Sequence, residues 1–514
     1  EDGTWAQGTA KYEKRGVASF VPEWISENCI QCNKCAYVCP HAAIRPFVLD
    51  ANEMAAAPTT DALPAIGKTF TGMQFIQAVD VLDCLGCGNC VDVCPGKKGV
   101  KALEMKPLET QLEVQKTWDY CVEKVESKQD LVDVKANVKN SQFATPLFEF
   151  SGACSGCGET PYVKLITQLY GDHEMVANAT GCSSIYSGSV PSTPYTTNKR
   201  GHGPAWANSL FEDNAEHGYG MYLGQEAIRN RLIAEVKAIA ESDKASDEAK
   251  AAAKVYLDTV NDGKANDVAT KALVAELEKA AAAGCPVAPA ILDEKQYLSK
   301  KSVWIFGGDG WAYDIGFGGL DHVIASGEDV NIMVFDTEVY SNTGGQASKA
   351  SQIGQVAQFA AAGKAIGKKN LAEIAMSYGY VYVAQVAMGA DMNQLLKALK
   401  EAEAYHGPSL IIGYAPCEMH GLKGGMQNCQ FEMKKAVEAG YWQMFRYNPT
   451  LESNKLTIDS KAPTADYVDF IKTETRYARL AQSFPARAEE LFAKADANAK
   501  AKYERLLKMG KLYE

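Results

Sequence analysis

Four continuous apolar runs in the second half of the chain predict buried β-strands. They are SVWIFGG (302–308), VNIMVFD (330–336), YVYVAQVA (380–387) and PSLIIGYAP (408–416). Runs of this kind, rich in β-branched residues, are typical of strands that helices cover on both faces. Helical patterns fall among them, over Ala372–Ser377 and Met392–Ala404. We therefore expect an α/β fold with a doubly wound parallel sheet.

The first part of the chain carries a different pattern. Two dense cysteine clusters are each followed by a short apolar run, at Ala43–Leu49 and at Val100–Met105, which indicates an internal repeat. A charged, Val-rich stretch over 118–145 separates this part from the strands, and we place the domain boundary within it. Two domains are thus predicted, over residues 1–125 and 126–514.

Two further segments have helical composition. The first, about residues 226–300, is rich in Ala, Lys and Glu and contains amphipathic stretches such as AIRNRLIAEVKAIAE. It is interpreted as a solvated helical insertion in the second domain. The second is the C-terminal stretch ELFAKADANAKAKYERLLKMGKLYE, which predicts a helix packed on the surface.

Composition and charge exclude several classes of protein. No apolar run reaches the roughly 18 residues of a membrane-spanning helix, and the start, EDGTWAQGTA, lacks the features of a signal peptide, so a cytoplasmic protein is expected. The net charge of −11 argues against a nucleic-acid partner, because neutralising phosphates needs a surplus of Lys and Arg. The start also lacks Met, so we expect a processed product or one piece of a longer polypeptide.

Two copies of the spacing C-x2-C-x2-C-x3-C-P predict iron–sulfur centres. Cysteines at intervals of this length can reach neighbouring corners of a [4Fe-4S] cube, and in two-cluster proteins the fourth cysteine of each run ligates the other cluster. One centre is therefore assigned to Cys29, Cys32, Cys35 and Cys94, and the other to Cys84, Cys87, Cys90 and Cys39. Zinc also binds C-x2-C pairs and is the alternative, but two complete copies of the longer run argue against it.

The remaining cysteines are less regular. Cys154 and Cys157 form one C-x2-C pair, whereas Cys182 and Cys417 stand alone. Cys417 follows the run PSLIIGYAP, at the kind of strand end where α/β sheets gather ligands. A pair and two single cysteines could form a third four-thiolate site, a question that spacing alone leaves open. Three cysteines without partner spacing are interpreted as ordinary thiols: Cys121, Cys285 and Cys429.

A glycine-rich turn predicts a diphosphate site. The turn Gly307–Gly310 directly follows a predicted strand, and the next strand runs into DTEVYSNTGG. Glycines at a strand end let the backbone approach a phosphate, and an Asp there can hold Mg2+. The spacing of the two loops is that of thiamine diphosphate enzymes, so we expect Mg2+ to bind Asp309, the Thr337 side chain, where Asn is usual, and the Val339 carbonyl. A tight turn in a nucleotide-free domain is the alternative.

Together these motifs closely resemble pyruvate:ferredoxin oxidoreductase, also called pyruvate synthase. The matching strings are CIQCNKCAYVCP, CLGCGNCVDVCP, CSGCGET, TGCSS and GGDGWAYDIGFGGLDH followed by DTEVYSNTGGQ, in the family's order across nearly the whole chain. The match is to the family's C-terminal portion, a ferredoxin-like α+β domain with two [4Fe-4S] clusters followed by the thiamine-diphosphate-binding domain. The resemblance implies oxidative decarboxylation of pyruvate with coenzyme A to acetyl-CoA and CO2, with electrons passing reversibly through three [4Fe-4S] clusters to ferredoxin or flavodoxin.

The resemblance also implies roles for individual residues. It places a third cluster on Cys154, Cys157, Cys182 and Cys417. It implies that Glu159 and Cys182 border the thiamine, and that the diphosphate lies among Gly308, Asp309, Gly310, Trp311, Thr337, Glu338, Val339, Tyr340, Ser341 and Asn342. Asn342 would also face the substrate carbonyl and act in catalysis. The domains that hold pyruvate and coenzyme A in this family are absent here, so we expect cofactor binding with poor turnover. A homodimer is implied as well.

Three other functions are considered. Another 2-oxo acid:ferredoxin oxidoreductase, acting on 2-oxoglutarate, indolepyruvate or branched-chain substrates, fits the same motifs, but the order of the domains favours the pyruvate enzyme. A non-catalytic, polyferredoxin-like electron carrier would have no use for a Mg2+ and diphosphate loop. A zinc-stabilised interaction protein predicts a colourless preparation.

Overall fold

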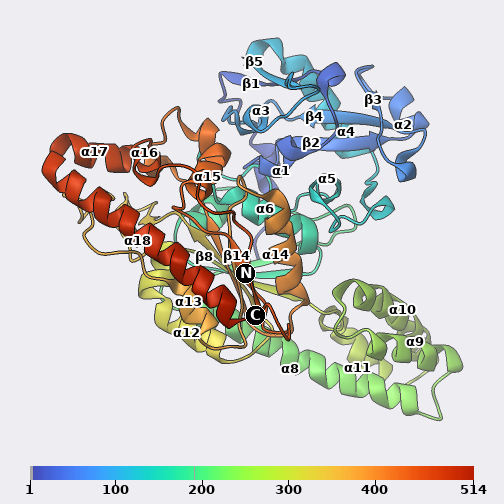
Figure 1. Cartoon of the computed structure of the whole chain (residues 1–514). Helices are drawn as coiled ribbons and strands as arrows, with labels where there is room; N and C mark the ends of the chain where they lie inside the picture. The colour runs from blue at the N-terminus through green and yellow to red at the C-terminus, as the bar shows by residue number, and fades with distance from the viewer. Residues whose placement is uncertain (1–3, 190) are drawn as a thin grey trace.

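A sheet of eight strands forms the centre of the computed structural model, which describes residues 4–189 and 191–514 (Figure 1). From one edge to the other the strands are β15 (Leu456–Ile458), β14 (Phe445–Tyr447), β12 (Tyr382–Val386), β13 (Ser409–Tyr414), β9 (Asn331–Asp336), β8 (Ser302–Gly308), β6 (Glu174–Asn178) and β7 (Ala205–Asn208). All neighbours from β12 to β7 pair in parallel, whereas β14 pairs antiparallel with both β12 and β15. The four predicted strands are confirmed, and the antiparallel edge was not predicted.

Helices cover both faces of this sheet. On one face, α6 (Thr160–Tyr170) stacks the ring of Tyr170 on Trp304 of β8, with ring centroids 6.0 Å apart. On the other face, α8 (Asn214–Glu241) places Gly218 so close to Ile305 that an added Cβ would lie 2.5 Å from its side chain. Because successive residues of a strand point to opposite faces, Trp304 and Ile305 show that the two helices lie on different sides. The predicted doubly wound arrangement is confirmed.

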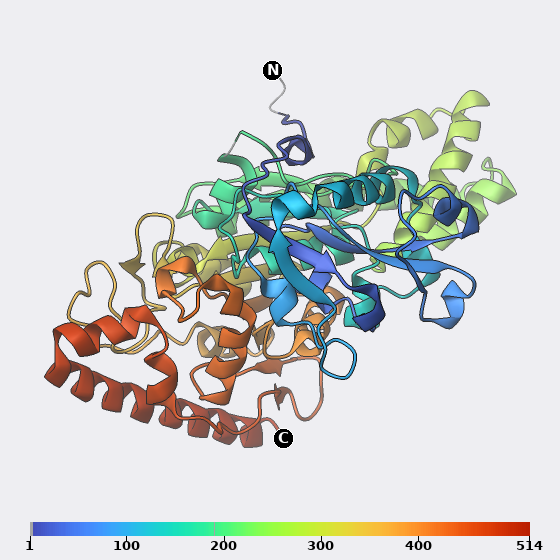
Figure 2. The same cartoon turned by 90° about the horizontal axis from the view of Figure 1, so that it is seen from above.

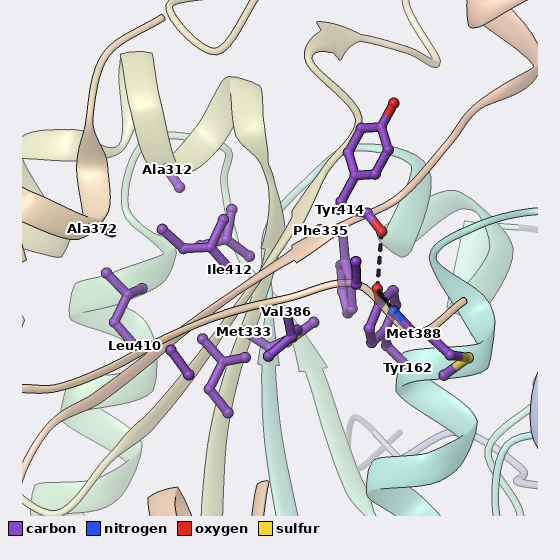
Figure 3. Packing of buried hydrophobic residues seen from close by; sticks show 14 of the residues in the cluster. Tyr162, Ala312, Met333, Phe335, Ala372, Val386, Met388, Leu410, Ile412 and Tyr414 are labelled. Atoms are coloured by element: carbon purple, nitrogen blue, oxygen red, sulfur yellow. Dashed lines mark hydrogen bonds between the residues drawn. The ribbon is translucent and has the colours of Figure 1, made fainter. Parts of the chain in front are cut away.

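The side chain of Tyr162 connects α6 to the ends of two central strands (Figure 3). Its hydroxyl group donates a hydrogen bond to the carbonyl oxygen of Tyr414 at 2.9 Å and accepts one from the backbone N–H of Met388, also at 2.9 Å. Tyr162 is 1% exposed, so water cannot replace either bond. One phenol therefore holds the chain after β12 against the end of β13.

The remaining helices around the sheet follow from the same apolar patterns. They are α12 (Phe317–Ala325), α13 (Leu371–Met376), α14 (Met392–Ala404), α15 (Cys429–Glu438), α16 (Tyr467–Ile471), α17 (Thr475–Ser483) and α18 (Pro485–Leu512). The helices predicted at 372–377 and 392–404 correspond to α13 and α14. Within the described part of the chain, no helix is long and apolar enough to cross a membrane.

A helical lobe extends from one end of the sheet (Figures 1 and 2). It comprises the distal part of α8 together with α9 (Asp247–Asp258), α10 (Gly263–Ala282) and α11 (Ala288–Asp293). These helices pack on a hydrophobic cluster of their own, around Leu232, Tyr256 and Leu273. The lobe lies between β7 and β8 in the sequence, in the region where a helical insertion is expected.

The N-terminal part is a small α+β unit with two short sheets. One sheet pairs β1 (Phe20–Trp24) with β5 (Leu103–Pro107), and the other has the order β2 (Ile44–Leu49), β4 (Gln74–Val79), β3 (Leu63–Pro64), all antiparallel. Short helices α1 (Lys34–Val38) and α3 (Asn89–Asp92) contain the third cysteine of each run, and the fourth cysteine follows each helix. Three more helices complete this part and its connection to the sheet: α2 (Ala51–Ala55), α4 (Gln115–Lys124) and α5 (Val138–Ser141).

Buried polar contacts join this unit to the large sheet. Lys164 of α6, 1% exposed, donates hydrogen bonds to the carbonyl oxygens of Ala36 and of Tyr37, the latter at 2.9 Å. Burial lowers the pKa of Lys164 to about 8. The hydroxyl group of Tyr37 in turn donates to the carbonyl oxygen of Met392 at 3.0 Å. The chain segment that carries the first cysteine run is thereby fixed to the sheet.

We expect Tyr162→Phe to destabilise the chain by about 1–3 kcal/mol, because it leaves the buried N–H of Met388 without its acceptor. Urea unfolding followed by circular dichroism measures the change. Tyr12→Phe is the matched control, because Tyr12 is 74% exposed and should change stability by less than about 0.5 kcal/mol. Equal midpoints for the two variants would contradict the role given to the Tyr162 hydroxyl.

Candidate functional site

The two cysteine runs fold into loops of the same shape. In the first loop Gln31 and Asn33 have φ angles of 56° and 59°, and in the second loop Gly86 and Gly88, at the equivalent positions, have φ angles of 67° and 82°. This left-handed backbone lets the N–H two residues after each first cysteine point at its sulfur, at 3.4 Å in both loops. The internal repeat seen in the sequence is therefore a repeat of local structure.

Each predicted set of four thiols lines one cavity. The first cavity is bounded by Cys29, Cys32, Cys35 and Cys94, and the second by Cys39, Cys84, Cys87 and Cys90. The last cysteine of each run has thus crossed to the other run's cavity. Burial, followed by the charge of Cys39, raises the pKa of Cys87 to about 12, so this thiol needs a positive partner to ionise there. Iron supplies such a charge, and a four-thiolate cage fits a [4Fe-4S] cluster.

The less regular cysteines also converge. Cys154 and Cys157 precede α6, Cys182 begins α7 (Cys182–Ser184) after β6, and Cys417 follows β13. Burial raises the pKa of Cys182, and the charges of Glu159, Cys417, Cys157 and Cys154 raise it further, so the four thiols lie within electrostatic range of one another. Among residues 4–189 and 191–514, no three His, Cys, Asp or Glu side chains are close enough to hold a single metal ion.

Cys429, interpreted from spacing as an ordinary thiol, lies beside this group. It is fully buried, and the charges of Cys157, Cys87 and Cys417 all raise its pKa in addition to burial. It therefore lies between the second and third sets of thiols. The spacing of cysteines along the sequence therefore does not decide whether Cys417 or Cys429 is the fourth ligand of the third set.

Direct contacts order the sites in space. The hydroxyl group of Ser155, between Cys154 and Cys157, donates to the carbonyl oxygen of Leu85 in the second cysteine loop at 2.9 Å. On the other side, His420, three residues after Cys417, donates from Nε2 to the carbonyl oxygen of Thr337 at 2.7 Å. The third set of thiols therefore lies between the second cysteine loop and the predicted diphosphate loop.

The predicted magnesium ligands converge on one another. Asp309 Oδ1 accepts hydrogen bonds from the Thr337 hydroxyl at 3.0 Å and from its N–H at 3.3 Å, and Thr337 Oγ1 lies 3.1 Å from the carbonyl oxygen of Val339. The Ser341 hydroxyl lies 2.9 Å from Thr337 Oγ1. Ser348, which the sequence did not single out, donates to Asp309 Oδ2 at 2.6 Å.

Asp309 is a buried carboxylate in need of positive charge. It is 1% exposed, and burial followed by the neighbouring Asp336 raises its pKa. No cationic side chain of the described chain forms an ion pair with it. A Cβ added to Gly308 would meet only the Phe335 carbonyl oxygen, at 3.8 Å, so the strand end is open to a ligand. These features fit a divalent cation with an attached diphosphate.

The other residues assigned through the resemblance surround this loop. Gly310 abuts the ring of Tyr340, where a Cβ would come within 2.6 Å, while Trp311 is fully buried and Asn342 is exposed. Glu159 lies on the side of the thiols, where burial raises its pKa to about 7 although the Tyr186 hydroxyl donates to it at 3.1 Å. Its backbone N–H also donates to Cys157 Sγ at 3.4 Å, so Glu159 lies beside the third set of thiols.

A buried ionic network lies behind the loop, and sequence reasoning missed it. Lys368 pairs with Asp336 at 2.7 Å and with Glu338 at 3.0 Å, and Arg476 pairs with Glu338 at 2.9 Å. Burial raises the pKa of Glu338, but the charges of Lys368 and Arg476 outweigh it and lower the pKa to about 2. His420, three residues after Cys417, donates from Nε2 to the carbonyl oxygen of Thr337 at 2.7 Å. No local sequence signal marks these partners, because the fold alone brings them together.

Comparisons with known proteins agree with this arrangement. A thiamine pyrophosphate enzyme C-terminal binding domain matches residues 270–412, and a 4Fe-4S dicluster domain matches residues 28–98. The pyruvate:ferredoxin oxidoreductase of Moorella thermoacetica is 54% identical over 99% of this chain and 44% of its own length. The pyruvate-flavodoxin oxidoreductase of Klebsiella pneumoniae is 52% identical over 98% of this chain and 43% of its own length. Over nearly its whole length the chain is therefore similar to part of the pyruvate:ferredoxin and pyruvate-flavodoxin oxidoreductases, which confirms the resemblance seen in the sequence.

The chain spans less than half the length of these relatives. The dicluster match contains both cysteine runs, and the thiamine pyrophosphate match contains Asp309 and Thr337. Iron–sulfur clusters and thiamine pyrophosphate are thereby supported as cofactors. Among solved structures, a 2-oxoglutarate:ferredoxin oxidoreductase from Magnetococcus marinus aligns over 52% of this chain and 64% of that chain, at 14% identity and a TM-score of 0.31, too weak a likeness to support an inference.

We expect Cys417→Ser to lower the iron content by about four atoms per chain, because a [4Fe-4S] centre would lose a thiolate. Anaerobic iron and acid-labile sulfide analysis measures the loss. Cys429→Ser is the matched control, since this neighbouring thiol is also buried, and it should leave the iron content unchanged. Loss of a cluster from Cys429→Ser and not from Cys417→Ser would identify Cys429 as the ligand.

Proposed function

We propose that this chain is the cofactor-binding part of an enzyme that oxidatively decarboxylates pyruvate with coenzyme A to acetyl-CoA and CO2. The electrons would pass through three [4Fe-4S] clusters to ferredoxin or flavodoxin, and the reaction would be reversible. One observation carries the proposal: His420, three residues after Cys417 of the third thiol set, hydrogen-bonds to the carbonyl oxygen of Thr337, a predicted magnesium donor, at 2.7 Å. This contact supports placing a redox centre next to a diphosphate loop.

In this proposal, the loop residues bind and orient one cofactor. Asp309, the Thr337 hydroxyl and the Val339 carbonyl would hold Mg2+, which neutralises the diphosphate. The open strand end at Gly308 lets the backbone approach that diphosphate, and the buried ring of Trp311 packs against the neighbouring Gly307. Thiamine diphosphate, when bound, supplies the carbon nucleophile and electron sink that decarboxylation of a 2-oxo acid needs. We place Asn342 at the exposed end of the loop, facing the substrate carbonyl.

The three thiol sets would provide the path for electrons. Cys154, Cys157, Cys182 and Cys417 hold the centre nearest the thiamine, the set completed by Cys39 is next, and the set completed by Cys94 is farthest. Backbone N–H groups point at the sulfurs of Cys29, Cys84 and Cys157 at 3.4 Å. Such bonds to sulfur tune the reduction potential of thiolate-ligated clusters.

The proposal extends to domains and partners. Residues 1–125 would form the two-cluster ferredoxin-like domain, and residues 126–514 the thiamine domain, with the third cluster and the helical insertion at about 226–300. Pyruvate and coenzyme A would bind mostly to parts of the protein outside this chain. A cytoplasmic homodimer with no nucleic-acid or membrane partner completes the proposal.

Two alternatives make different predictions. Another 2-oxo acid, such as 2-oxoglutarate or indolepyruvate, would use the same cofactors, so the substrate must be tested with the whole protein. A non-catalytic electron carrier would contain the dicluster unit but would not bind thiamine. The converging donors around Asp309 favour the enzyme, because a carrier has no use for them.

Anaerobic iron, sulfide and thiamine content of one sample tests the proposal directly. We expect roughly twelve irons, four for each cluster, and one thiamine diphosphate per chain. Roughly eight irons without thiamine would instead identify a two-cluster carrier. Zinc in place of iron would refute both.

We expect Asp309→Ala to weaken Mg2+-dependent binding of thiamine diphosphate more than about 100-fold while the iron content stays unchanged, because a direct ligand is removed. Equilibrium dialysis with a thiochrome assay measures the affinity. Asp243→Ala, an exposed carboxylate in the turn after α8, is the control and should bind as the unmodified chain does. Unchanged affinity in Asp309→Ala would refute the metal assignment.

A further inference from the structure

The residues on either side of Thr337 are both carboxylates, and one lysine holds them. Asp336 and Glu338 have fully buried side chains, and the side chain of Lys368 is 8% exposed. Lys368 Nζ lies 2.7 Å from Asp336 Oδ2 and 3.0 Å from Glu338 Oε1. Lys368 has no hydrogen bond to Thr337, Val339 or Asp309, although its charge acts through space to lower the pKa of Asp309 against burial. Its direct contacts with this loop are therefore the two with Asp336 and Glu338.

The backbone between the two carboxylates is strained. Glu338 has a φ of 62°, in the left-handed region that non-glycine residues rarely adopt. This turn brings the Val339 carbonyl oxygen back to 3.1 Å from Thr337 Oγ1, so that both oxygens lie on the side of Asp309. If the backbone of Glu338 were extended, the Val339 carbonyl would point away from Thr337 Oγ1. The left-handed conformation of Glu338 is therefore what brings the predicted metal donors together.

Side-chain contacts keep Glu338 in this conformation. Its carboxylate accepts from Lys368, from Arg476 at 2.9 Å and from Gln352 at 3.2 Å, and its backbone carbonyl accepts from Gln355 at 3.2 Å. Of these groups, only Lys368 also reaches Asp336, whose other side-chain donor is the Tyr313 hydroxyl at 2.8 Å. Two buried carboxylates this close repel each other, and a cation between them offsets that repulsion.

We propose that Lys368 is a positioning residue for the divalent metal, and through it for the diphosphate. By joining Asp336 to Glu338, it holds the turn in which Thr337 Oγ1 and the Val339 carbonyl face Asp309. The proposal rests on the proposed function, because it needs a metal-dependent diphosphate ligand at this loop. It goes beyond that function by assigning a role to a residue that contacts neither metal nor ligand.

A purely structural ion pair is the competing explanation, and the chain offers a matched control. Arg446 of β14 also joins two carboxylates, Glu401 at 2.6 Å and Asp459 at 2.9 Å, and its side chain is likewise 8% exposed. It lies at the antiparallel edge of the sheet, away from the loop. Removing either cation leaves two carboxylates without their shared partner, although Glu401 and Asp459 are 23% and 14% exposed whereas Asp336 and Glu338 are fully buried. Only one of the two networks flanks Thr337.

The experiment compares Lys368→Met and Arg446→Met in the full chain loaded with its clusters under anaerobic conditions. Thiamine diphosphate bound at equilibrium is measured as Mg2+ is titrated, and urea unfolding gives the stability of each variant. We expect both variants to lose stability. Only Lys368→Met should raise the Mg2+ concentration for half-maximal binding, by about tenfold, equivalent to about 1.4 kcal/mol.

A second variant keeps the proposal testable if Lys368→Met does not fold. Lys368→Arg keeps the charge but has a different reach, and we expect this variant to fold. It should raise the Mg2+ requirement about threefold, which is less than the increase expected for Lys368→Met. A Mg2+ requirement within twofold of the unmodified chain in every folded Lys368 variant overturns the positioning role. Failure of the unmodified chain to bind thiamine diphosphate overturns the proposed function and this inference together.

Discussion

The parallel pairing of β8, β9 and β13 is the constraint on which the site depends. In their register Gly308 lies beside Phe335, and Asp336 lies beside Tyr414, so the three strands end at one level. Asp309, Thr337 and Cys417 follow these ends within three residues. Because neighbouring strands lie about 4.8 Å apart, residues far apart in sequence, such as Asp336 and Tyr414, become neighbours. A shift in register would separate the metal donors from one another and from the third thiol set.

The second constraint at this edge of the sheet is that its buried carboxylates need cations and hydrogen-bond donors around them. Asp336 at the end of β9 and Glu338 in the loop that follows are buried carboxylates, and Asp309 adds a third. Such groups are tolerated only when cations and hydrogen-bond donors surround them, and removing one partner from a buried pair commonly costs 3–5 kcal/mol. Lys368 and Arg476 come from segments that carry no recognisable motif, yet they make the conformation of Glu338 possible.

Local sequence patterns predicted the parts of the site that are built locally. The C-x2-C-x2-C-x3-C-P runs specify both the loops and the exchange of Cys39 and Cys94, because each loop needs only its own short stretch of backbone. The run 330–336 predicted β9 within one residue, since a continuous apolar stretch has few other solutions in an α/β protein.

Contacts between distant segments could not be predicted in this way. Spacing did not reveal that Cys429 lies near Cys157, that Ser348 binds Asp309 or that Lys368 lies between two carboxylates. The antiparallel strands β14 and β15 are only three residues each and leave almost no periodic signal. The third thiol set was assigned through a family resemblance, and the geometry that brings its members together depends on the whole sheet.

The position of Arg476 in the chain has a consequence for biosynthesis. This guanidinium group and the Tyr441 hydroxyl both contact Glu338, but they enter the ribosomal exit tunnel more than a hundred residues after it. Synthesis proceeds at about 5–20 residues per second, so for several seconds the nascent loop has its carboxylates without one of their cations. The two cysteine runs have emerged by then. Cluster assembly in the N-terminal unit can therefore precede completion of the diphosphate loop, because both cysteine runs come before Arg476 in the chain.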